Sequence, residues 1–304
     1  MAAPTALPRL SQLPLREGDP PNSAWGLWGK DDNLGSLNYL TDECVLKTLK
    51  EDVASGERLG LDLPLDFFQP PLLGRVGVSQ QVINKYPLVV NDDIIIFNTQ
   101  CSSQWDSLRH FAYQEEKKFY NGTTQEEIHS GPRTSANSLQ PWTARGIAGR
   151  GVLIDYASWA AEKGISYDHF AKYGIPIRDV KAIAASQGVS FVAGDILFLR
   201  TGYVKAYREL SAKRKETTEW LWERQFAAVA SDSPGFECRP PVEPEWHLHQ
   251  ILLAGWGTPI GELFDLDRLS ELCKQRQKWA FFVTSAPLNY TGAVASPPNA
   301  IAIL

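Results

Sequence analysis

Residues 92–111 read DDIIIFNTQCSSQWDSLRHF, and the prediction of the fold starts from this stretch. Its first half contains a short, β-branched apolar run, Ile94 to Phe97, which predicts a strand buried on both faces. The run then passes into a dense set of polar side chains. The stretch therefore predicts a strand end at which chemically active groups gather.

The spacing of those polar residues is specific. Gln104 and Asp106 are two residues apart, which places both side chains on one side of an extended chain. Asp106 and His110 are four apart, which fits one helical turn. A strand end, a loop and a helix start would bring them to one point, where carboxylate and imidazole are good Zn or Mn ligands and a carboxamide is a weaker one. An Asp helix cap followed by a histidine in the first turn is equally compatible with the pattern.

A second polar group lies in residues 245–266, which read EWHLHQILLAGWGTPIGELFDL. His247 and His249 are two residues apart, and Glu262 follows after a turn that contains glycine and proline. A histidine and a distant glutamate can complete a metal shell or supply a proton relay. The alternative is a surface His-x-His pair on a helix, followed by a glutamate that caps the next element.

The overall composition narrows the classes of function. The chain has 304 residues, 43% of them hydrophobic, and a net charge of −5, which disfavours nucleic acid or an anionic membrane as a partner. The N-terminus lacks a continuous apolar signal segment, and no apolar stretch is long enough to span a membrane. The four cysteines are widely spaced, which is typical of reduced thiols. We therefore expect a cytoplasmic protein whose partner is a small-molecule substrate.

The order of predicted elements indicates one α/β domain. Residues 1–24 are rich in proline and predict an extended N-terminal arm, and residues 25–304 alternate between strands and helices without repeats or a linker. Helices are predicted within 41–52, 155–164, 177–188, 215–230, 246–254 and 265–277. Strands are predicted within 58–67, 92–100, 152–154, 191–203 and 279–288.

Together the two polar segments resemble the cyclase family that includes bacterial kynurenine formamidase and isatin hydrolase. That family carries a His-x-Gly-Thr-His-x-Asp-x-Pro-x-His segment, and Asp106 and His110 align with its Asp and its last His. Its other positions are occupied here by Gln100 and Gln104 (the first two His) and by Ser102 and Ser103 (the Gly-Thr). The later segment is similar too, with His249 before Leu252 and Leu253 and Glu262 in the acidic position. Other stretches resemble a longer subgroup found in fungi and actinobacteria.

The resemblance implies a fold and a set of roles. The fold would be a swivelling β/β/α fold, with a central, mainly antiparallel, barrel-like sheet wrapped by helices, in a homodimer or homotetramer. A divalent metal, Mn or Zn, would be held by Gln104, Asp106, His249 and Glu262. The catalytic residues would be His110, for proton transfer, and Asp106. The substrate would be contacted by Gln100, Ser102, Ser103, Trp105 and Tyr120.

Three functions are consistent with these residues. The first is a metal-dependent hydrolase that opens a C–N bond of a small aromatic amide, formamide or lactam with a metal-activated water. The second is a cofactor-free cyclase or isomerase of a secondary metabolite that uses Asp106 and His110 as an acid/base pair, because two carboxamides in place of two imidazoles weaken a metal site. The third is a non-catalytic binding protein on an enzyme scaffold.

Overall fold

The computed structural model describes residues 7–68, 71–130, 134–167, 173–204, 216–237 and 247–304. Its α-helices are α1 (Asp42–Glu51), α2 (Gln125–His129), α3 (Gln140–Arg145), α4 (Tyr156–Glu162), α5 (Ile177–Ser186), α7 (Glu216–Arg224) and α8 (Asp267–Arg276). Its strands are β1 (Arg58–Gly60), β2 (Ser79–Asn84), β3 (Asn91–Ile96), β4 (Gln104–Asp106), β5 (Ile147–Asp155), β6 (Ile196–Arg200), β7 (Ala228–Ser231), β8 (Ile260–Glu262), β9 (Ala280–Ser285), β10 (Ala295–Ser296) and β11 (Ala300–Ile303). None of the described helices combines the length and the apolar character that a membrane crossing requires.

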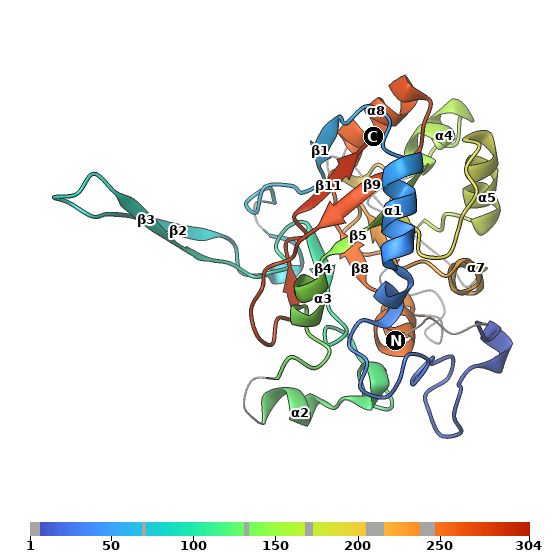
Figure 1. Cartoon of the computed structure of the whole chain (residues 1–304), viewed down its shortest axis with the longest axis horizontal. Helices are drawn as coiled ribbons and strands as arrows, with labels where there is room; N and C mark the ends of the chain where they lie inside the picture. Colours follow the sequence, from blue (N-terminus) through green and yellow to red (C-terminus); the bar gives the residue numbers. More distant parts are fainter. Residues whose placement is uncertain (1–6, 69–70, 131–133, 168–172, 205–215, 238–246) are drawn as a thin grey trace.

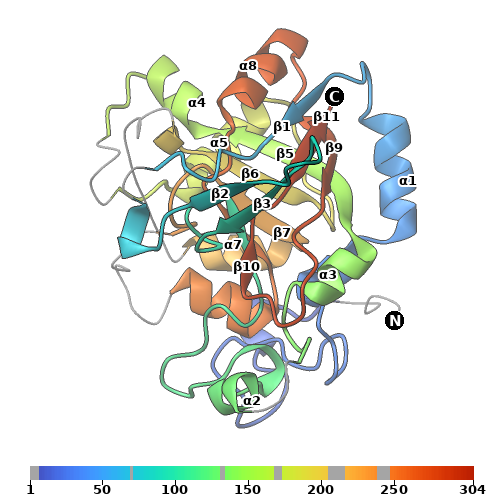
Figure 2. The ribbon, with the colours of Figure 1, turned by 90° about the vertical axis from the view of Figure 1, so that its left-hand side faces the viewer.

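A curled, mixed sheet forms the centre of the molecule. Among the described residues, nine strands follow the order β1-β11-β9-β5-β6-β7-β8-β4-β10. The central strands β5 to β8 run parallel, and the pairs on both flanks are antiparallel. Helices surround the sheet, with α1 against β5 and β9 and α4 against β6 (Figures 1 and 2). The predicted α/β fold, a mainly antiparallel barrel-like sheet wrapped by helices, is confirmed.

Side-chain caps begin two of the helices. The side chain of Thr41 accepts a hydrogen bond from the backbone N–H of Cys44 and begins α1. Asp155 ends β5 and caps α4 through the N–H of Ser158. These caps satisfy backbone donors that a helix leaves unpaired at its first turn. The helices predicted within 177–188 and 265–277 are present as α5 and α8. The strands predicted within 152–154, 191–203 and 279–288 are present as parts of β5, β6 and β9.

The prediction of a strand buried on both faces at 92–100 is wrong. Residues Asn91–Ile96 form β3, which is exposed along its whole length and pairs with β2 in a separate two-stranded sheet. This sheet projects far from the body of the molecule (Figure 1). A β-branched apolar run shows that the segment makes a strand with apolar sides, but it does not show which surface will cover those sides.

Two further expectations differ from the structure. The helix α7 ends at Arg224, and the buried strand β7 follows in a region where we expected helix up to Ser231. Residues after Asp106 form a turn, in which the N–H of His110 donates to the carbonyl of Ser107, instead of a helix start. In both places a short local pattern is overridden by pairing with distant strands.

The N-terminal segment packs against elements late in the sequence. Trp25 donates its indole N–H to the carbonyl of Ala254 at 2.6 Å, and the N–H of Ala24 donates to the carbonyl of Gly255 at 2.9 Å. The acceptors lie in a seven-residue π-helix, η6 (Gln250–Trp256). The wider turns of a π-helix displace carbonyls from the α-helical pattern. Residues 24–25 therefore fix the element that precedes β8.

Candidate active site

Strands β4 and β8 bring the two predicted polar segments together. They pair antiparallel, with Gln104 directly opposite Glu262. Side chains of directly opposed residues lie on the same face of a sheet, and here the Nε2 of Gln104 donates to Oε2 of Glu262 at 2.8 Å. Asp106 is two residues further along β4 and therefore lies on this face as well. The sheet register thus joins residues that are 158 positions apart.

Asp106, His249 and Glu262 form a buried group that could hold a metal ion, with one ligand atom of each within 4.8 Å of the others. All three side chains are almost completely inaccessible to solvent. The Oδ2 atom of Asp106 has no hydrogen-bond partner in the described part of the chain. A buried carboxylate oxygen without a partner is costly, and a cation would remove that cost. The donor set, two carboxylates and an imidazole, fits Zn or Mn.

The two glutamines bind to the acidic residues of this group. The Nε2 of Gln100 donates to Oδ1 of Asp106 at 2.6 Å, as that of Gln104 does to Glu262. The Nη1 of Arg75 donates to the carbonyl of Gln100 at 2.7 Å and lies 3.4 Å from Oε1 of Gln104. In this arrangement the amino group of Gln104 faces the carboxylates and its oxygen faces Arg75. Gln104 therefore lies at the site but presents a donor to it.

His110 lies at the edge of the group, with a side chain that is 19% exposed. Its Nε2 is 3.7 Å from Oδ2 of Asp106, and its ring nitrogens are 3.3 Å from Nε2 of Gln100. Burial raises the pKa of Asp106 and lowers the pKa of His110, although each residue's charge opposes the shift in the other. Burial thus favours the neutral form of both groups, which suits a pair that exchanges a proton.

Glu237 is a site residue that the sequence did not reveal. Its Oε1 lies 2.5 Å from Nδ1 of His249 and 3.0 Å from Nε2 of His247, and its Oε2 accepts from the N–H of Leu248 at 2.6 Å. Because Nδ1 of His249 contacts Glu237, the other ring nitrogen, Nε2, faces Glu262 and lies 3.0 Å from its Oε1. A carboxylate behind an imidazole in this way fixes the ring and its tautomer. The signal in the sequence for this role is weak: Glu237 is an acidic residue that precedes the His-x-His pair.

The geometry also distinguishes the two histidines. His249 is buried and faces Glu262, whereas His247 is partly exposed and packs edge-on against Phe111, with ring centroids 4.8 Å apart. Burial alone would lower the pKa of His249, but the carboxylates of Glu237 and Glu262 raise it to about 9. His249 is therefore the histidine that lies beside both Asp106 and Glu262.

Four of the predicted substrate-contacting residues have their polar atoms in internal hydrogen bonds. Ser102 donates to the carbonyl of Pro64 at 2.7 Å, and Ser103 accepts from the N–H of Leu63 at 2.8 Å. Trp105 donates to Oγ of Ser285 at 3.0 Å, and Tyr120 donates to Oδ2 of Asp32 at 3.0 Å. All four are buried. Of the five predicted contacts, Gln100 is the one that the structure places directly against Asp106 and His110.

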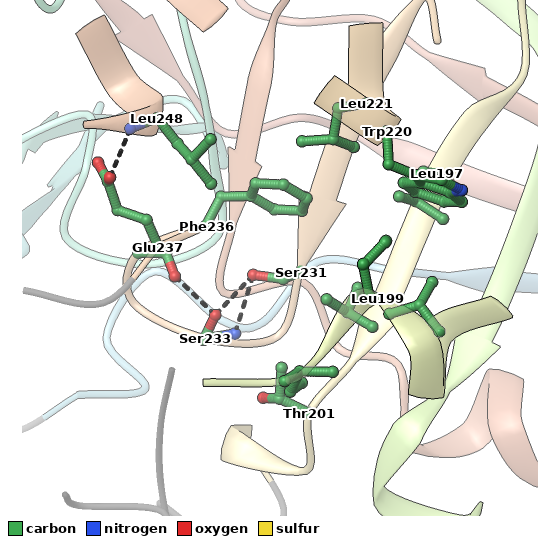
Figure 3. Close-up of a pocket in the computed structure, with 14 residues that line it drawn as sticks. Leu197, Leu199, Thr201, Trp220, Leu221, Ser231, Ser233, Phe236, Glu237 and Leu248 are labelled. Atoms are coloured by element: carbon green, nitrogen blue, oxygen red, sulfur yellow. Dashed lines mark hydrogen bonds between the residues drawn. The ribbon is translucent and has the colours of Figure 1, made fainter. Parts of the chain in front are cut away.

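A cavity of about 60 Å³ adjoins the site across Glu237. It lies where β6 and β7 end, next to β8, and Figure 3 shows Phe236 and Leu197 reaching into it from opposite sides. The apolar lining comes from Ile175, Ile177, Val180, Leu197, Leu199, Trp220, Leu221, Phe236 and Leu248. Its polar edge is formed by Thr201, Ser231, Ser233 and Glu237. The carboxyl ends of parallel strands are the usual place for a ligand in a sheet of this kind.

Comparison with known proteins identifies the family of this chain. The family model described as putative cyclase matches residues 41–238, which is more than half of the chain, and the protein therefore belongs to the cyclase family. A crystal structure described as a novel cyclase is 29% identical, with a TM-score of 0.82, and the match covers 93% of this chain and 99% of that one. No curated protein matches the chain by sequence.

More distant solved structures share the fold. Isatin hydrolase A from Labrenzia aggregata, solved with benzyl benzoate, is 18% identical with a TM-score of 0.59, and the match covers 84% of this chain and 98% of that one. A predicted metal-dependent hydrolase from Bacillus stearothermophilus is 15% identical with a TM-score of 0.51, covering 82% of this chain and 98% of that one. Both structures therefore show that the fold of this chain is shared by proteins of low sequence identity.

Proposed function

We propose that the protein is a hydrolase that opens a C–N bond of a small aromatic amide, formamide or lactam, and that it uses a divalent metal, Mn or Zn, held by Asp106, His249 and Glu262. The observation that supports this most directly is the unpaired Oδ2 of Asp106, buried beside His249 and Glu262. When bound there, the metal would supply an acidified water and polarise the substrate carbonyl.

Other residues around the site would transfer the proton and hold the site in position. His110, beside Asp106, would carry the proton that the leaving nitrogen requires. Gln100 and Gln104 would hold the carboxylates of Asp106 and Glu262 in place through their amide N–H groups. Ser102, Ser103, Trp105 and Tyr120 would fix the segments around the site, because their polar atoms are bound inside the protein.

The substrate class is inferred from the apolar cavity and from the relatives. The cavity beside Glu237 would accept the apolar part of a small substrate. Two isatin hydrolase structures of the same fold were solved with benzyl benzoate and with the product analogue thioisatinate, both of which are aromatic. An acidic chain with such a site is suited to a small molecule in the cytoplasm and not to nucleic acid or a membrane.

The metal and the reaction can be tested separately. We expect chelator-stripped protein to take up one equivalent of Mn²⁺ or Zn²⁺ at high affinity, and Asp106→Asn and His249→Ala to lose this uptake. His129→Ala, at an exposed histidine, is the matched control and should bind metal normally.

Mass spectrometry of products from a panel of aryl formamides and lactams should show the addition of one water. Metal-free protein with full, chelator-resistant activity would contradict the proposal.

A second candidate is a cofactor-free cyclase or isomerase, and one observation favours it. The amino groups of Gln100 and Gln104 already donate to the carboxylates of Asp106 and Glu262, so both carboxylates have a hydrogen-bond donor without a metal. In that case Asp106 and His110 would move the proton themselves. A product of unchanged mass, together with loss of turnover in Asp106→Asn and His110→Ala but not on chelation, would select this function.

A further inference from the structure

The side-chain amide of Gln104 turns its nitrogen toward the acidic group and its oxygen away from that group. Its Nε2 donates to Oε2 of Glu262 at 2.8 Å, and its Oε1 lies 3.4 Å from Nη1 of Arg75. Gln104 is completely buried, so both ends of the amide need a partner inside the protein. In the described part of the chain, Arg75 is the donor that reaches the oxygen. Arg75 therefore fixes which way this amide points.

Arg75 is itself held in place by the backbone. Its N–H donates to the carbonyl of Leu72 at 3.2 Å, and its Nη1 donates to the carbonyl of Gln100 at 2.7 Å. A guanidinium group has only donors. If the amide of Gln104 were turned by half a turn, its nitrogen would face Arg75, donor against donor. Its oxygen would then face the carboxylate of Glu262, acceptor against acceptor, so the observed orientation is the favourable one while no cation is bound.

The orientation of this amide matters because the oxygen of a carboxamide binds a metal ion and its nitrogen does not. Gln104 lies directly opposite Glu262 and on the same face of the sheet as Asp106. Its side chain therefore borders the group that could hold a metal ion, and it offers that group an N–H and no lone pair. A cation there would have three protein ligands. Catalytic metal sites keep a further position open for water or substrate, whereas structural sites are closed by four protein ligands.

We propose that Arg75 is a positioning residue that keeps Gln104 from becoming a metal ligand and so keeps one coordination position open for water. This inference rests on the proposed metal site. Without Arg75, the amide would lose the donor for its oxygen, and a cation would draw that oxygen toward itself. The site would gain a fourth protein ligand and lose a nearby positive charge that opposes cation binding. It would therefore bind a metal ion more tightly and leave less room for water.

Titration of chelator-stripped protein with Mn²⁺ tests this role. We expect Arg75→Ala to bind Mn²⁺ at least about tenfold more tightly than the wild type. A change that merely loosened the structure would weaken binding, so the sign of the effect separates the two roles. The relaxation of water protons by bound Mn²⁺ should fall in Arg75→Ala, because the oxygen of Gln104 replaces a water. Arg75→Lys, which retains a cationic donor, and Arg178→Ala, at a side chain that is 83% exposed, should bind as the wild type does.

A double-mutant cycle separates the effect of the amide from the effect of the lost charge. In a Gln104→Leu background there is no oxygen to turn, so the gain in affinity on removal of Arg75 should be at least about fivefold smaller. Equal gains in both backgrounds would overturn the proposal, as would weaker binding or unchanged water relaxation in Arg75→Ala. A wild type that binds no Mn²⁺ would overturn the proposed metal as well. Failure of the predicted changes in a protein that does bind Mn²⁺ would overturn this inference alone.

Discussion

The Nδ1 atom of His249 lies 2.5 Å from Oε1 of Glu237, while the Nε2 atom of the same ring lies 3.0 Å from Oε1 of Glu262. One imidazole thus connects the loop after β7 to the end of β8. Gln104 binds Glu262, and Gln100 binds Asp106. Arg75 contacts both glutamines, so a continuous set of polar contacts runs from Glu237 to the two ends of β4. The orientation of each member depends on its neighbours.

Glu237→Gln tests the role of the carboxylate behind His249. The variant keeps the shape of the side chain but removes the charge that holds Nδ1. We expect metal affinity to fall about 10- to 100-fold, as is usual when a residue behind a metal-binding histidine is changed. Titration of stripped protein with Mn²⁺ or Zn²⁺ gives the dissociation constant, and Glu57→Gln, at a partly exposed glutamate paired with Arg276, is the control. Unchanged affinity in Glu237→Gln would show that His249 holds its position unaided.

The two histidines of the His-x-His pair should differ sharply. His249→Ala removes a buried imidazole at the centre of the site, and we expect kcat/KM to fall by about 1,000-fold or more. His247→Ala removes a partly exposed ring that packs on Phe111, and the loss should stay below about tenfold. Steady-state kinetics with the same substrate decide the point. Equal losses in both variants would mean that His247 also acts on the substrate or on a metal.

Gly257→Ala should destabilise the protein strongly. Gly257 has φ of +65°, and a Cβ at this position would lie 2.8 Å from the Cα of Gly35 and 2.8 Å from the ring of Tyr120. We expect the free energy of unfolding to fall by about 3 kcal/mol or more, since backbone strain and a steric clash act together. Gly56→Ala is the matched control, because Gly56 has φ of +71° but no atom within 4 Å of the added Cβ.

The control should lose only the cost of the left-handed backbone, about 1 kcal/mol. Guanidinium denaturation of both variants gives the two values. If Gly56→Ala cost as much as Gly257→Ala, the close contact between residues 35 and 257 would contribute nothing.

The titration of Asp232 makes the free energy of unfolding depend on pH, and the shift of its pKa fixes the direction of that dependence. Burial raises its pKa to about 6, although hydrogen bonds from Thr201 oppose the shift. The native state therefore keeps the proton to a higher pH than the unfolded state, in which the aspartate has its ordinary pKa of 3.8. Between these values the contribution of Asp232 to stability falls as pH rises, by up to about 3 kcal/mol in total. Above the native pKa the loss is complete.

Asp232→Asn removes this titration. The difference in unfolding free energy between the variant and the wild type should therefore move in favour of the variant from pH 4 to pH 7, as followed by urea denaturation at a series of pH values. A difference that is constant with pH would contradict the prediction. Other carboxylates titrate identically in both proteins and cancel in the comparison.

Elements with strong local signals were predictable from the sequence. The helix at 41–52 and the strand at 152–154 each follow from nearby residues, and the structure has both, although β5 already begins at Ile147. The pairing of Asp106 with His249 and Glu262 was found only because two segments resembled one family pattern. Its geometry depends on the register between β4 and β8, which no local pattern contains.

The failures also have physical reasons. The run from Ile94 was expected to be buried in this chain, yet its side chains are exposed on the two-stranded sheet of β2 and β3, since apolar character does not say which surface will cover it. Glu237 was missed because its role depends on a loop that folds back onto His249. The helical pattern of residues 215–230 predicted a helix that continues past Arg224, so the short strand β7 that follows it was not predicted.

The placement of β11 affects how the chain can fold during its synthesis. This strand lies between β1 and β9, so among the described strands β1 has no partner until residues 300–303 are available. The contacts of Trp25 with Ala254 must likewise wait for the later segment. We therefore expect closure of the sheet to be a late step of folding.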